Sequence, residues 1–241
     1  MCENIKGAVV TGASSGIGLA VSQSLCRLGY EVYGIGRNFE KEEVHKASEE
    51  MGEHFHKIVC DVLDTNKLCS TVKQISRECG IELLVNNAGV GYYGLHEELS
   101  PSKIQQMVRT NLEVPMILTQ QLLRTLKKNS GTIINISSVT AKQSNPHGCA
   151  YGATKAGLSS FCSSLFDEAR KYGLKVVTIQ PDMAKTNLYR NADFCEGEEE
   201  ESYLLPQDVA EAVEYILRQR NGVVISEITL KPQLHRIRKK K

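Results

Sequence analysis

A tyrosine and a lysine, Tyr151 and Lys155, stand four residues apart in a stretch that the sequence predicts to be helical. Residues four apart lie on one face of a helix, so the phenol and the ammonium group should face the same side. A free tyrosine has a pKa of about 10. A nearby ammonium group favours the phenolate and would lower the pKa of Tyr151, so that it could exchange a proton near neutral pH. This spacing alone is common, and its meaning depends on the surrounding residues.

Two polar residues earlier in the chain could complete a catalytic group. Ser138 lies at the end of a predicted strand, where its hydroxyl could hold a carbonyl oxygen against Tyr151. Ser137 is the alternative, but side chains alternate along a strand, so the two point to opposite faces and we favour Ser138. Asn111 lies within a predicted helix, where asparagine is usually unfavourable. Each residue has an ordinary structural explanation, but the set of four favours proton transfer at a carbonyl or alcohol oxygen.

A glycine-rich turn, Gly12-Ala13-Ser14-Ser15-Gly16-Ile17-Gly18, follows the first predicted strand and leads into an amphipathic helix. Gly12 permits a tight turn, Gly16 lets backbone N–H groups approach a pyrophosphate, and Gly18 allows close packing of helix on strand. The spacing is Gly-x-x-x-Gly-x-Gly rather than the Gly-x-Gly-x-x-Gly fingerprint. A P-loop is excluded because no Lys-Ser or Lys-Thr follows the last glycine. The turn therefore predicts a dinucleotide site.

The end of the second predicted strand bears on which dinucleotide would bind. A site selective for NAD usually places a carboxylate there for the ribose 2′-hydroxyl, whereas NADP needs a cation for its 2′-phosphate. No acidic residue occurs from Val32 to Phe39, and Arg37 offers a fork of N–H donors. The sequence therefore favours NADP(H) over NAD(H), although Arg37 could also be an ordinary surface residue.

Short apolar runs alternate with longer, helix-like stretches along the whole chain. The runs are nearly continuous in apolar residues, as expected for parallel strands covered on both faces. The predicted strands lie at residues 7–11, 31–35, 55–59, 82–85, 132–137, 175–179 and 223–230. The predicted helices lie near residues 17–28, 40–51, 65–79, 101–127, 150–172 and 207–219. This alternation predicts an α/β fold with a doubly wound parallel sheet, and we expect residues 1–241 to form a single domain.

The order and spacing of these motifs resemble those of one protein family. The resemblance spans nearly the whole chain, and the joint occurrence of the motifs is highly specific. The motifs are Thr11-Gly12-x-x-x-Gly16-x-Gly18, Asp61, Asn86-Asn87-Ala88-Gly89, Asn111, Ser138, Tyr151 and Lys155. Together they are similar to the pattern of the short-chain dehydrogenase/reductase family.

The resemblance implies a Rossmann-type, three-layer α/β/α fold with seven parallel strands ordered 3-2-1-4-5-6-7 and a nicotinamide cofactor across the strand ends. Asp61 and Val62 would contact the adenine, Thr186 would contact the carboxamide, and Lys155 would bind the nicotinamide ribose. Asn111 would hold a water that links Lys155 to solvent. Family members are commonly homotetramers, so we expect a homotetramer or a homodimer. The full set of expected cofactor contacts is Gly12, Ser14, Ser15, Gly16, Ile17, Gly18, Arg37, Asp61, Val62, Asn87, Ala88, Gly89, Tyr151, Lys155, Pro181 and Thr186.

The sixth predicted strand ends in a departure from the family pattern. The family usually has Pro-Gly at this point, whereas this chain has Pro181-Asp182. Asp182 therefore places a charge and a Cβ where a permissive glycine is usual, which puts the local turn and the adjacent pocket wall in doubt. The assignment of Ser138, Tyr151 and Lys155 does not depend on this turn.

Loops at the same strand ends should shape the substrate site. They lie at residues 90–95, 140–149 and 183–205, and the first contains Tyr92-Tyr93. His147 could contact a polar substrate group or face solvent. The loops contain no cluster of arginines, and Arg190 alone is weak support for a strongly anionic substrate.

Composition argues against several other classes of protein. The 29 basic and 28 acidic side chains leave a formal charge of +1, so no overall field would attract nucleic acid or anionic lipid. No apolar run approaches a membrane span, no signal-peptide region begins the chain, and the eight cysteines include no Cys-x-x-Cys pair. We therefore expect a cytoplasmic protein with reduced thiols and no metal site. The acidic run 196–201 and the basic tail 236–241 are interpreted as a solvated loop and a frayed end.

These observations predict an NADP(H)-dependent oxidoreductase that interconverts a ketone or aldehyde and an alcohol by hydride transfer. A carbonyl reductase, a hydroxy-acid dehydrogenase and a hydroxysteroid dehydrogenase all remain open. The expected partner is a small carbonyl or alcohol substrate, with neither nucleic acid nor membrane. The alternative is an NADP-binding redox sensor without catalysis, which would have little need for Asn111, Ser138, Tyr151 and Lys155 together.

Overall fold

A computed structural model describes residues 6–240 and contains a parallel sheet of seven strands. The strand order is β3-β2-β1-β4-β5-β6-β8, which confirms the order expected from the family with β8 as the seventh strand. Residues 1–5, where no signal peptide was expected, and Lys241, the end of the basic tail, lie outside the described residues. The strands are β1 (Lys6–Thr11), β2 (Tyr30–Gly36), β3 (Phe55–Val59), β4 (Ile81–Asn86), β5 (Thr132–Ile136), β6 (Lys175–Pro181) and β8 (Glu227–Leu230).

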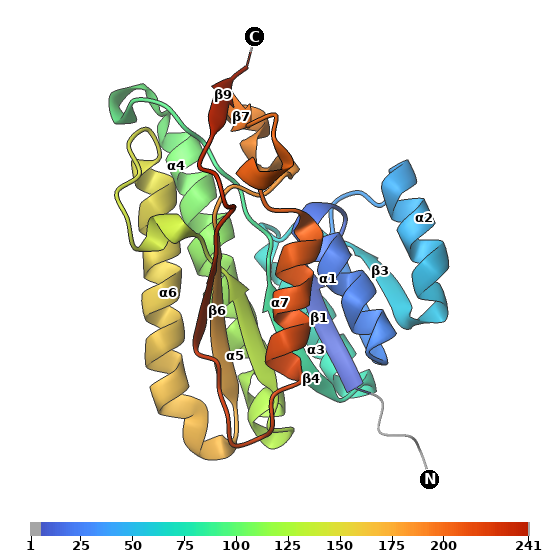
Figure 1. Cartoon of the computed structure of the whole chain (residues 1–241). Coiled ribbons are helices and arrows are strands. Elements are labelled where there is room, and N and C mark those ends of the chain that lie inside the picture. Colours follow the sequence, from blue (N-terminus) through green and yellow to red (C-terminus); the bar gives the residue numbers. More distant parts are fainter. Residues whose placement is uncertain (1–5, 241) are drawn as a thin grey trace.

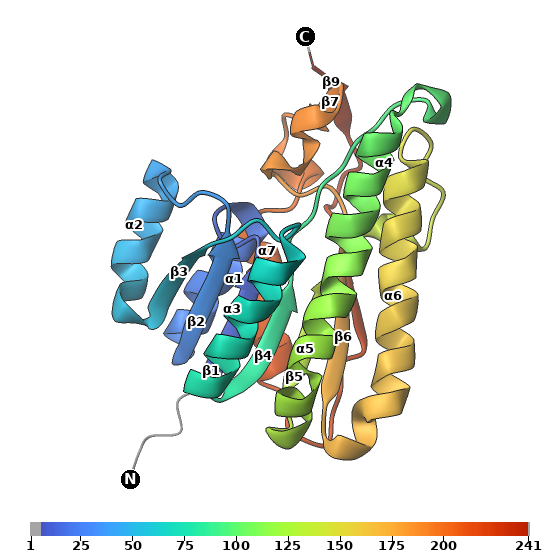
Figure 2. The ribbon, with the colours of Figure 1, turned by 180° about the vertical axis from the view of Figure 1, so that it is seen from behind.

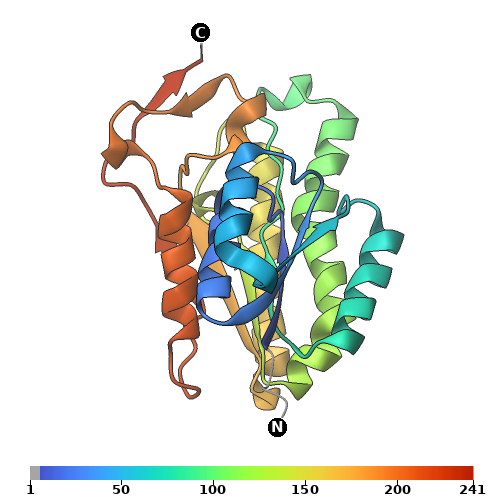
Figure 3. The same cartoon turned by 90° about the vertical axis from the view of Figure 1, so that its right-hand side faces the viewer.

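Helices cover both faces of the sheet (Figures 1 and 2). Figure 3 shows α7 on one side of the sheet and α3, α4 and α5 on the other. Within residues 6–240, no helix combines the length and the apolar character that crossing a membrane would require. The helices are α1 (Gly16–Arg27), α2 (Glu42–Met51), α3 (Thr65–Glu78), α4 (Pro101–Val108), α5 (Val114–Lys128), α6 (Cys149–Ala169) and α7 (Pro206–Leu217). Short 3₁₀ turns lie at Gly52–His54, His96–Glu98, Val139–Ala141, Arg170–Tyr172, Asn187–Asn191 and Glu200–Ser202.

The core consists of two apolar layers, one on each side of the sheet. Successive side chains of β1 enter different layers: Ala8 and Val10 pack with α1, α2 and α7, and Val9 packs with α3, α5 and α6. All three side chains are fully buried. A strand that is covered on both faces needs apolar residues at every position, which explains the continuous apolar runs of the sequence. The structure therefore confirms the predicted three-layer α/β fold.

Three predicted elements differ from the structure. The single helix predicted at 101–127 is divided by a π-helical turn, Arg109–Glu113, that contains Asn111. The strand predicted at 223–230 is shorter than expected, since only Glu227–Leu230 pair with β6. The predicted helix at 150–172 ends as an α-helix at Ala169 and continues as a 3₁₀ turn.

The basic tail is paired within the described residues and is not frayed, while most of the charged side chains of both runs stay exposed to solvent, as expected. A second, two-stranded antiparallel sheet joins β7 (Phe194–Glu196) to β9 (Ile237–Lys239). Arg236 and Arg238 of the tail form ion pairs with Glu199 and Glu198 of the acidic run. We call this pairing the β7–β9 ribbon, and Figure 1 shows it above the main sheet. The opposite charges of the two runs are complementary where they meet.

Candidate active site

The glycine turn after β1 folds as its spacing predicts. Gly12 and Gly16 have φ values of +68° and +52°, a left-handed conformation that glycine adopts easily. Gly18 is constrained by space, since a Cβ there would lie 2.3 Å from the carbonyl oxygen of Gly12. Ser15, which precedes α1, makes no side-chain capping bond. The first N–H groups of α1 are therefore open to an anionic ligand such as a pyrophosphate.

Thr11 ties the glycine turn to the loop after β4. Its hydroxyl oxygen accepts hydrogen bonds from the backbone N–H groups of Asn87 and Ala88, both at 3.0 Å. The side-chain amide of Asn87 in turn donates to the carbonyl oxygen of Thr11 at 2.9 Å. The two motifs that the sequence predicted to share a site are therefore held against each other.

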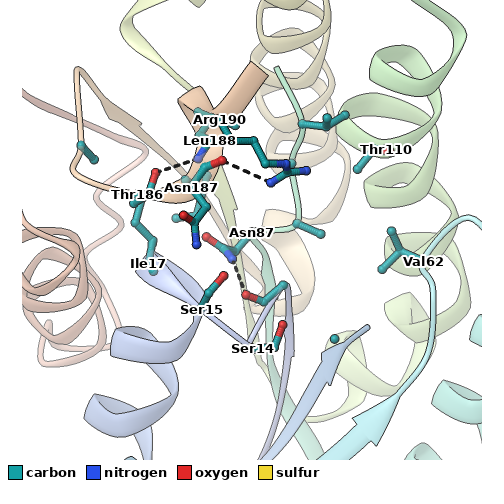
Figure 4. A pocket seen from close by; sticks show the side chains of 18 of the residues that line it. Ser14, Ser15, Ile17, Val62, Asn87, Thr110, Thr186, Asn187, Leu188 and Arg190 are labelled. Atoms are coloured by element: carbon teal, nitrogen blue, oxygen red, sulfur yellow. Dashed lines mark hydrogen bonds between the residues drawn. The ribbon is translucent and has the colours of Figure 1, made fainter. Parts of the chain in front are cut away.

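One cleft contains most of the expected cofactor contacts. Gly18, also expected to contact the cofactor, does not line the cleft, and its lack of a Cβ instead lets α1 pack against the carbonyl oxygen of Gly12. Figure 4 shows Ser14 and Ser15 on one side of this cleft and Asn187, Leu188 and Arg190 on the other. The expected contacts that line it are Gly12, Ser14, Ser15, Gly16, Ile17, Arg37, Asp61, Val62, Asn87, Ala88, Gly89, Tyr151, Lys155, Pro181 and Thr186.

The adenine end of the cleft lies beside the ends of β2 and β3. Arg37 is exposed there, immediately after β2. The Asp61 carboxylate accepts a hydrogen bond from the N–H of Leu63 at 2.9 Å, and its carbonyl oxygen accepts one from the N–H of Asp64 at 3.0 Å. These bonds fix the turn that presents Val62 to the cleft. The positions agree with the expected cofactor contacts, and the individual contacts remain predictions.

Tyr151 and Lys155 lie on one face of α6 and are both buried, with 4% of each residue exposed. The Lys155 Nζ atom lies 5.7 Å from the centre of the Tyr151 ring. It also donates a hydrogen bond to the carbonyl oxygen of Ile136, at the end of β5, at 2.8 Å. The expected pair is therefore present at the cleft, and Lys155 anchors α6 to the sheet.

The structure separates the roles of the two candidate serines. The Ser137 hydroxyl donates to the carbonyl oxygen of Lys155 at 3.0 Å and lies 3.0 Å from the Ser159 hydroxyl, so it bonds β5 to α6. The Ser138 hydroxyl accepts a hydrogen bond from the N–H of Thr140 at 3.2 Å. It also lies close enough to the Tyr151 phenol for a hydrogen bond that lowers the pKa of Tyr151. Ser138 is therefore the serine placed to act with Tyr151, as strand alternation predicted.

The protein environment acts on the two titratable groups chiefly through burial. Burial raises the pKa of Tyr151 to about 12, and the Ser138 hydroxyl opposes this shift with a smaller effect. Burial also lowers the pKa of Lys155 to about 8. The protein's own groups therefore leave the pKa of Tyr151 above 10, and the predicted lowering by Lys155 would need the positive charge of the oxidised nicotinamide as well. The prediction from sequence left out desolvation, which disfavours the phenolate of Tyr151 and the ammonium of Lys155.

Asn111 is fully buried in the π-helical turn. Its side chain accepts a hydrogen bond from the N–H of Val90 and donates one to the Val90 carbonyl oxygen, both at 2.9 Å. It also donates to the Thr154 hydroxyl at 3.2 Å. The side chain therefore joins the loop after β4 to α6, and the water contact expected of Asn111 remains a prediction. Single π-turns within helices are frequent at functional sites.

The turn after β6 tolerates Asp182 without left-handed strain. Among the described residues, the non-glycine residues with positive φ are Ser130 and His147, so Asp182 is not one of them. The Asp182 N–H donates to the carbonyl oxygen of Leu230, and its carboxylate accepts from the N–H of Met183, both at 2.9 Å. Asp182 also lines the cleft. The doubt about this turn is resolved, and a carboxylate is left in the pocket wall.

Three aromatic side chains form a wall beside Tyr151. The Tyr93 ring lies 5.6 Å from that of Tyr151, 5.9 Å from that of Tyr189 and 5.1 Å from that of Phe194. We call Tyr93, Tyr189 and Phe194 the aromatic wall. The sequence indicated the loops that contain these residues, but no motif singled out Tyr189 or Phe194. His147 lies outside the wall with an exposed side chain, and its carbonyl oxygen accepts a hydrogen bond from the N–H of Gly94 at 2.8 Å.

Known proteins share this arrangement over nearly the whole chain. The pattern of the short chain dehydrogenase family matches residues 6–194. An uncharacterised oxidoreductase of Staphylococcus epidermidis is 31% identical over 229 residues, covering 94% of this chain and 97% of the relative. Serine 3-dehydrogenase of Rhizobium radiobacter is 32% identical over 234 residues, covering 93% and 92%. The crystal structure of an alcohol dehydrogenase of Thermococcus sibiricus, complexed with 5-hydroxy-NADP, superimposes with a TM-score of 0.86 at 26% identity, covering 98% and 100%.

The chain belongs to the short-chain dehydrogenase/reductase family. It is accordingly an oxidoreductase of the class that acts on alcohol or carbonyl groups with a nicotinamide cofactor. The left-handed glycines, the open N-terminus of α1 and the cleft beside Tyr151 fit such a cofactor.

Proposed function

We propose that this protein is an NADP(H)-dependent carbonyl reductase that interconverts a ketone or aldehyde and an alcohol. One observation carries the proposal: the buried Tyr151–Lys155 pair on α6 and the open N-terminus of α1 face the same cleft. Groups suited to proton transfer and groups suited to holding a dinucleotide are thereby brought together. A protein that only senses the dinucleotide would need the second set without the first.

When bound, the reduced cofactor supplies a hydride to the carbonyl carbon. The residues of this chain would then act on the carbonyl oxygen. The Tyr151 phenol would donate its proton to that oxygen, and the Ser138 hydroxyl would donate a hydrogen bond to it. The Lys155 ammonium would stabilise the phenolate that remains and would bind the nicotinamide ribose. Asn111 would keep the loop after β4 and α6 in register, through its bonds to Val90 and Thr154.

The raised pKa of Tyr151 suits reduction. A phenol whose pKa is about 12 stays protonated at neutral pH and is ready to donate. Donation is favourable because an alkoxide is a stronger base than a phenolate. The reverse reaction needs the phenolate, whose formation burial opposes, so it would depend on the positive charges of Lys155 and the oxidised nicotinamide. The protonation state of the free protein therefore suits the reductive step, while the ratio of reduced to oxidised cofactor sets the direction of the net reaction.

The preference for NADP(H) is proposed from the end of β2. Arg37 lines the cleft and is exposed, so its guanidinium is free to meet a 2′-phosphate. No acidic residue stands between Val32 and Phe39 to bind a ribose 2′-hydroxyl. The alcohol dehydrogenase of Thermococcus sibiricus, which carries 5-hydroxy-NADP, supports the same assignment.

The substrate is proposed to be a neutral carbonyl compound with an apolar or aromatic substituent. Tyr189 of the aromatic wall lines the cleft, and Tyr93 packs against the Tyr151 ring, so this side of the site favours apolar contacts. The Asp182 carboxylate lines the cleft and would repel a carboxylate on the substrate. A hydroxy acid is thereby disfavoured relative to a neutral ketone or a hydroxysteroid.

The test is a panel of ketones, aldehydes and alcohols, followed through the absorbance of NADPH and repeated with NADH. We expect turnover of neutral ketones with NADPH, weaker turnover with NADH, and poor turnover of keto acids. Turnover that is faster with NADH would contradict the assignment of Arg37 and leave the enzyme class intact. Tight NADPH binding without turnover of any compound would instead favour the redox sensor.

A further inference from the structure

The loop after β6 carries two residues of the aromatic wall. Its base is closed by backbone hydrogen bonds, from the N–H of Leu204 to the carbonyl oxygen of Met183 at 2.7 Å and from the N–H of Lys185 to that of Leu204 at 2.8 Å. Tyr189 and Phe194 lie in the far part of this loop, in the 3₁₀ turn Asn187–Asn191 and in β7. The closed base does not by itself fix the position of these two rings.

The C-terminal segment, residues 236–240, holds that far part of the loop. β9 pairs with β7, and two flanking backbone bonds extend the ribbon, from Lys240 N–H to the carbonyl oxygen of Asp193 at 2.7 Å and from Gly197 N–H to that of Arg236 at 3.2 Å. The Lys240 ammonium also donates to the carbonyl oxygen of Tyr189 at 2.5 Å. The segment therefore contacts the backbone around both wall residues.

Charge complementarity supports the same pairing. Five glutamates occur within residues 196–201, and four basic residues occur within residues 236–240. Arg238 lies 3.2 Å from Glu198, and Arg236 forms an ion pair with Glu199. These side chains are largely exposed, so water and salt screen their attraction. The ribbon is therefore the more easily opened part of the substrate side.

The C-terminal segment can affect Tyr151 only through other residues that lie between them. Phe194 and Tyr189 each contact Tyr93, and Tyr93 contacts the Tyr151 ring. Tyr93 lies against Gly91, where a Cβ would come within 2.8 Å of its ring, so the ring sits close to the backbone of the loop after β4. None of residues 236–240 lines the cleft. A displacement of the segment would thus move the wall directly, whereas Thr186, the expected cofactor contact on this loop, lies beside Lys185 at the closed base.

We propose that residues 236–240 are a positioning brace that fixes Tyr189 and Phe194 against Tyr93 and so sets substrate affinity and selectivity. The brace acts on the wall and leaves proton transfer by Tyr151 and cofactor binding unchanged. Its effect on substrate rests on the proposed function, whereas its effect on the loop does not. The two effects are therefore measured separately.

The test uses charge reversal on each side of the ribbon. The tail variant R236E/R238E and the loop variant E198R/E199R each place like charges together, and the combined fourfold variant exchanges the charges and restores attraction. The matched control is R170E, which reverses an exposed arginine that pairs with Asp167 on α6, away from the ribbon. Hydrogen exchange of the amides in 187–197 is measured on the full-length protein without substrate. KM and kcat for a neutral ketone and the Kd for NADPH are measured beside it.

We expect both double variants to speed exchange in 187–197 and to raise KM about three- to tenfold, as the loss of two exposed ion pairs with new repulsion allows. The fourfold variant should return both the exchange rate and KM most of the way to those of the unmodified protein. R170E should change neither. The Kd for NADPH should change less than about twofold in every variant. Unchanged exchange in both double variants would overturn the brace. Faster exchange with an unchanged KM and unchanged selectivity would overturn its role in substrate binding. Should no substrate be found, the proposed function fails while the exchange data still decide whether the brace exists.

Discussion

The cofactor end and the substrate end of the cleft are built on different foundations. At the cofactor end, the glycine turn stands on β1, a central strand of the main sheet with neighbours on both sides. Thr11 there bonds two backbone N–H groups of the loop after β4. At the substrate end, Tyr189 and Phe194 depend on a ribbon of two three-residue strands outside that sheet. The first foundation is buried, and the second is exposed to water.

This difference determines which substitutions each end of the cleft can tolerate. Substitutions in a buried, closely packed turn force backbone atoms to move, so they should impair folding and cofactor binding together. Substitutions in an exposed ribbon should shift a loop by small free energies and alter substrate preference. One end is suited to holding one constant cofactor, and the other is suited to variation among substrates.

The largest expected effect comes from removing the proton donor where the two ends meet. Tyr151→Phe should lower kcat by about 10²–10⁴-fold, the range typical of a general acid, while NADPH binding and folding are kept. Stopped-flow or steady-state NADPH oxidation measures the loss, and quenching or calorimetric titration measures the Kd. The matched control is Tyr93→Phe, which removes a phenol from the neighbouring ring and should retain most of kcat. Near-normal turnover in Tyr151→Phe would exclude the proposed role.

A smaller but broader effect is expected at the foundation of the cofactor end. In Gly18→Ala the added Cβ would lie 2.3 Å from the carbonyl oxygen of Gly12, a backbone atom that cannot rotate away. We expect a loss of about 1–3 kcal/mol of unfolding free energy and weaker NADPH binding, because the turn and α1 must separate. Thermal or urea unfolding and NADPH titration measure the two effects.

Gly157→Ala is the matched control for this change. Its Cβ would meet only side-chain atoms of Leu112, at 3.2 Å or more, and these can shift. If both variants were equally stable and bound NADPH equally well, close packing at Gly18 would not explain the glycine.

The cofactor end could be predicted from the sequence because local rules determine it. Only glycine suits the φ of Gly12 and the space at Gly18, and apolar runs mark the buried strands that carry them. Asn111 was recognisable because asparagine is out of place in a helix, although the π-turn itself was not predicted. The regular alternation of apolar runs and helices predicted a doubly wound parallel sheet, whereas the order of its seven strands followed only from the resemblance to the family.

The substrate end could not be predicted in the same way. The residues that meet in the β7–β9 ribbon are far apart in the sequence: Glu198 and Arg238 are separated by 40 positions, and each charged run alone is typical of a solvated segment. Their contact exists only because the fold brings the tail after β8 back to the loop after β6. The pKa of Tyr151 was missed for a related reason, since helical spacing shows that Lys155 is near but does not show that both groups are buried.

Arg37→Leu is expected to reduce the preference for NADPH over NADH by about tenfold or more. Arg37→Leu removes a guanidinium that would meet the 2′-phosphate, and a hydrogen bond to a charged group contributes about 1.5–3 kcal/mol. The Kd for NADPH should therefore rise about 10- to 100-fold, while the Kd for NADH stays within about twofold. Titration with both dinucleotides measures this, and Arg77→Leu, an exposed arginine on α3, is the control. An equal effect on both dinucleotides would show that Arg37 does not select NADPH.

The smallest effect is expected at Asp182, where the substrate end meets the end of β6. Asp182→Asn keeps the side-chain oxygen that accepts from the N–H of Met183 and removes only the charge. Because Asp182 lines the cleft, the loss of a negative charge should lower KM for a keto acid by about two- to fivefold, since exposed charges a few ångströms apart interact by roughly 1 kcal/mol or less. KM for a neutral ketone and the unfolding free energy should stay unchanged. Asp182→Gly separates the effect of the charge from that of the backbone. It removes the same charge and makes the backbone more flexible, although the native φ does not require glycine. It should therefore match Asp182→Asn in KM and lose about 0.4–1 kcal/mol of unfolding free energy. A neutral and an anionic ketone that respond equally to both variants would show that Asp182 acts on the turn and not on the substrate.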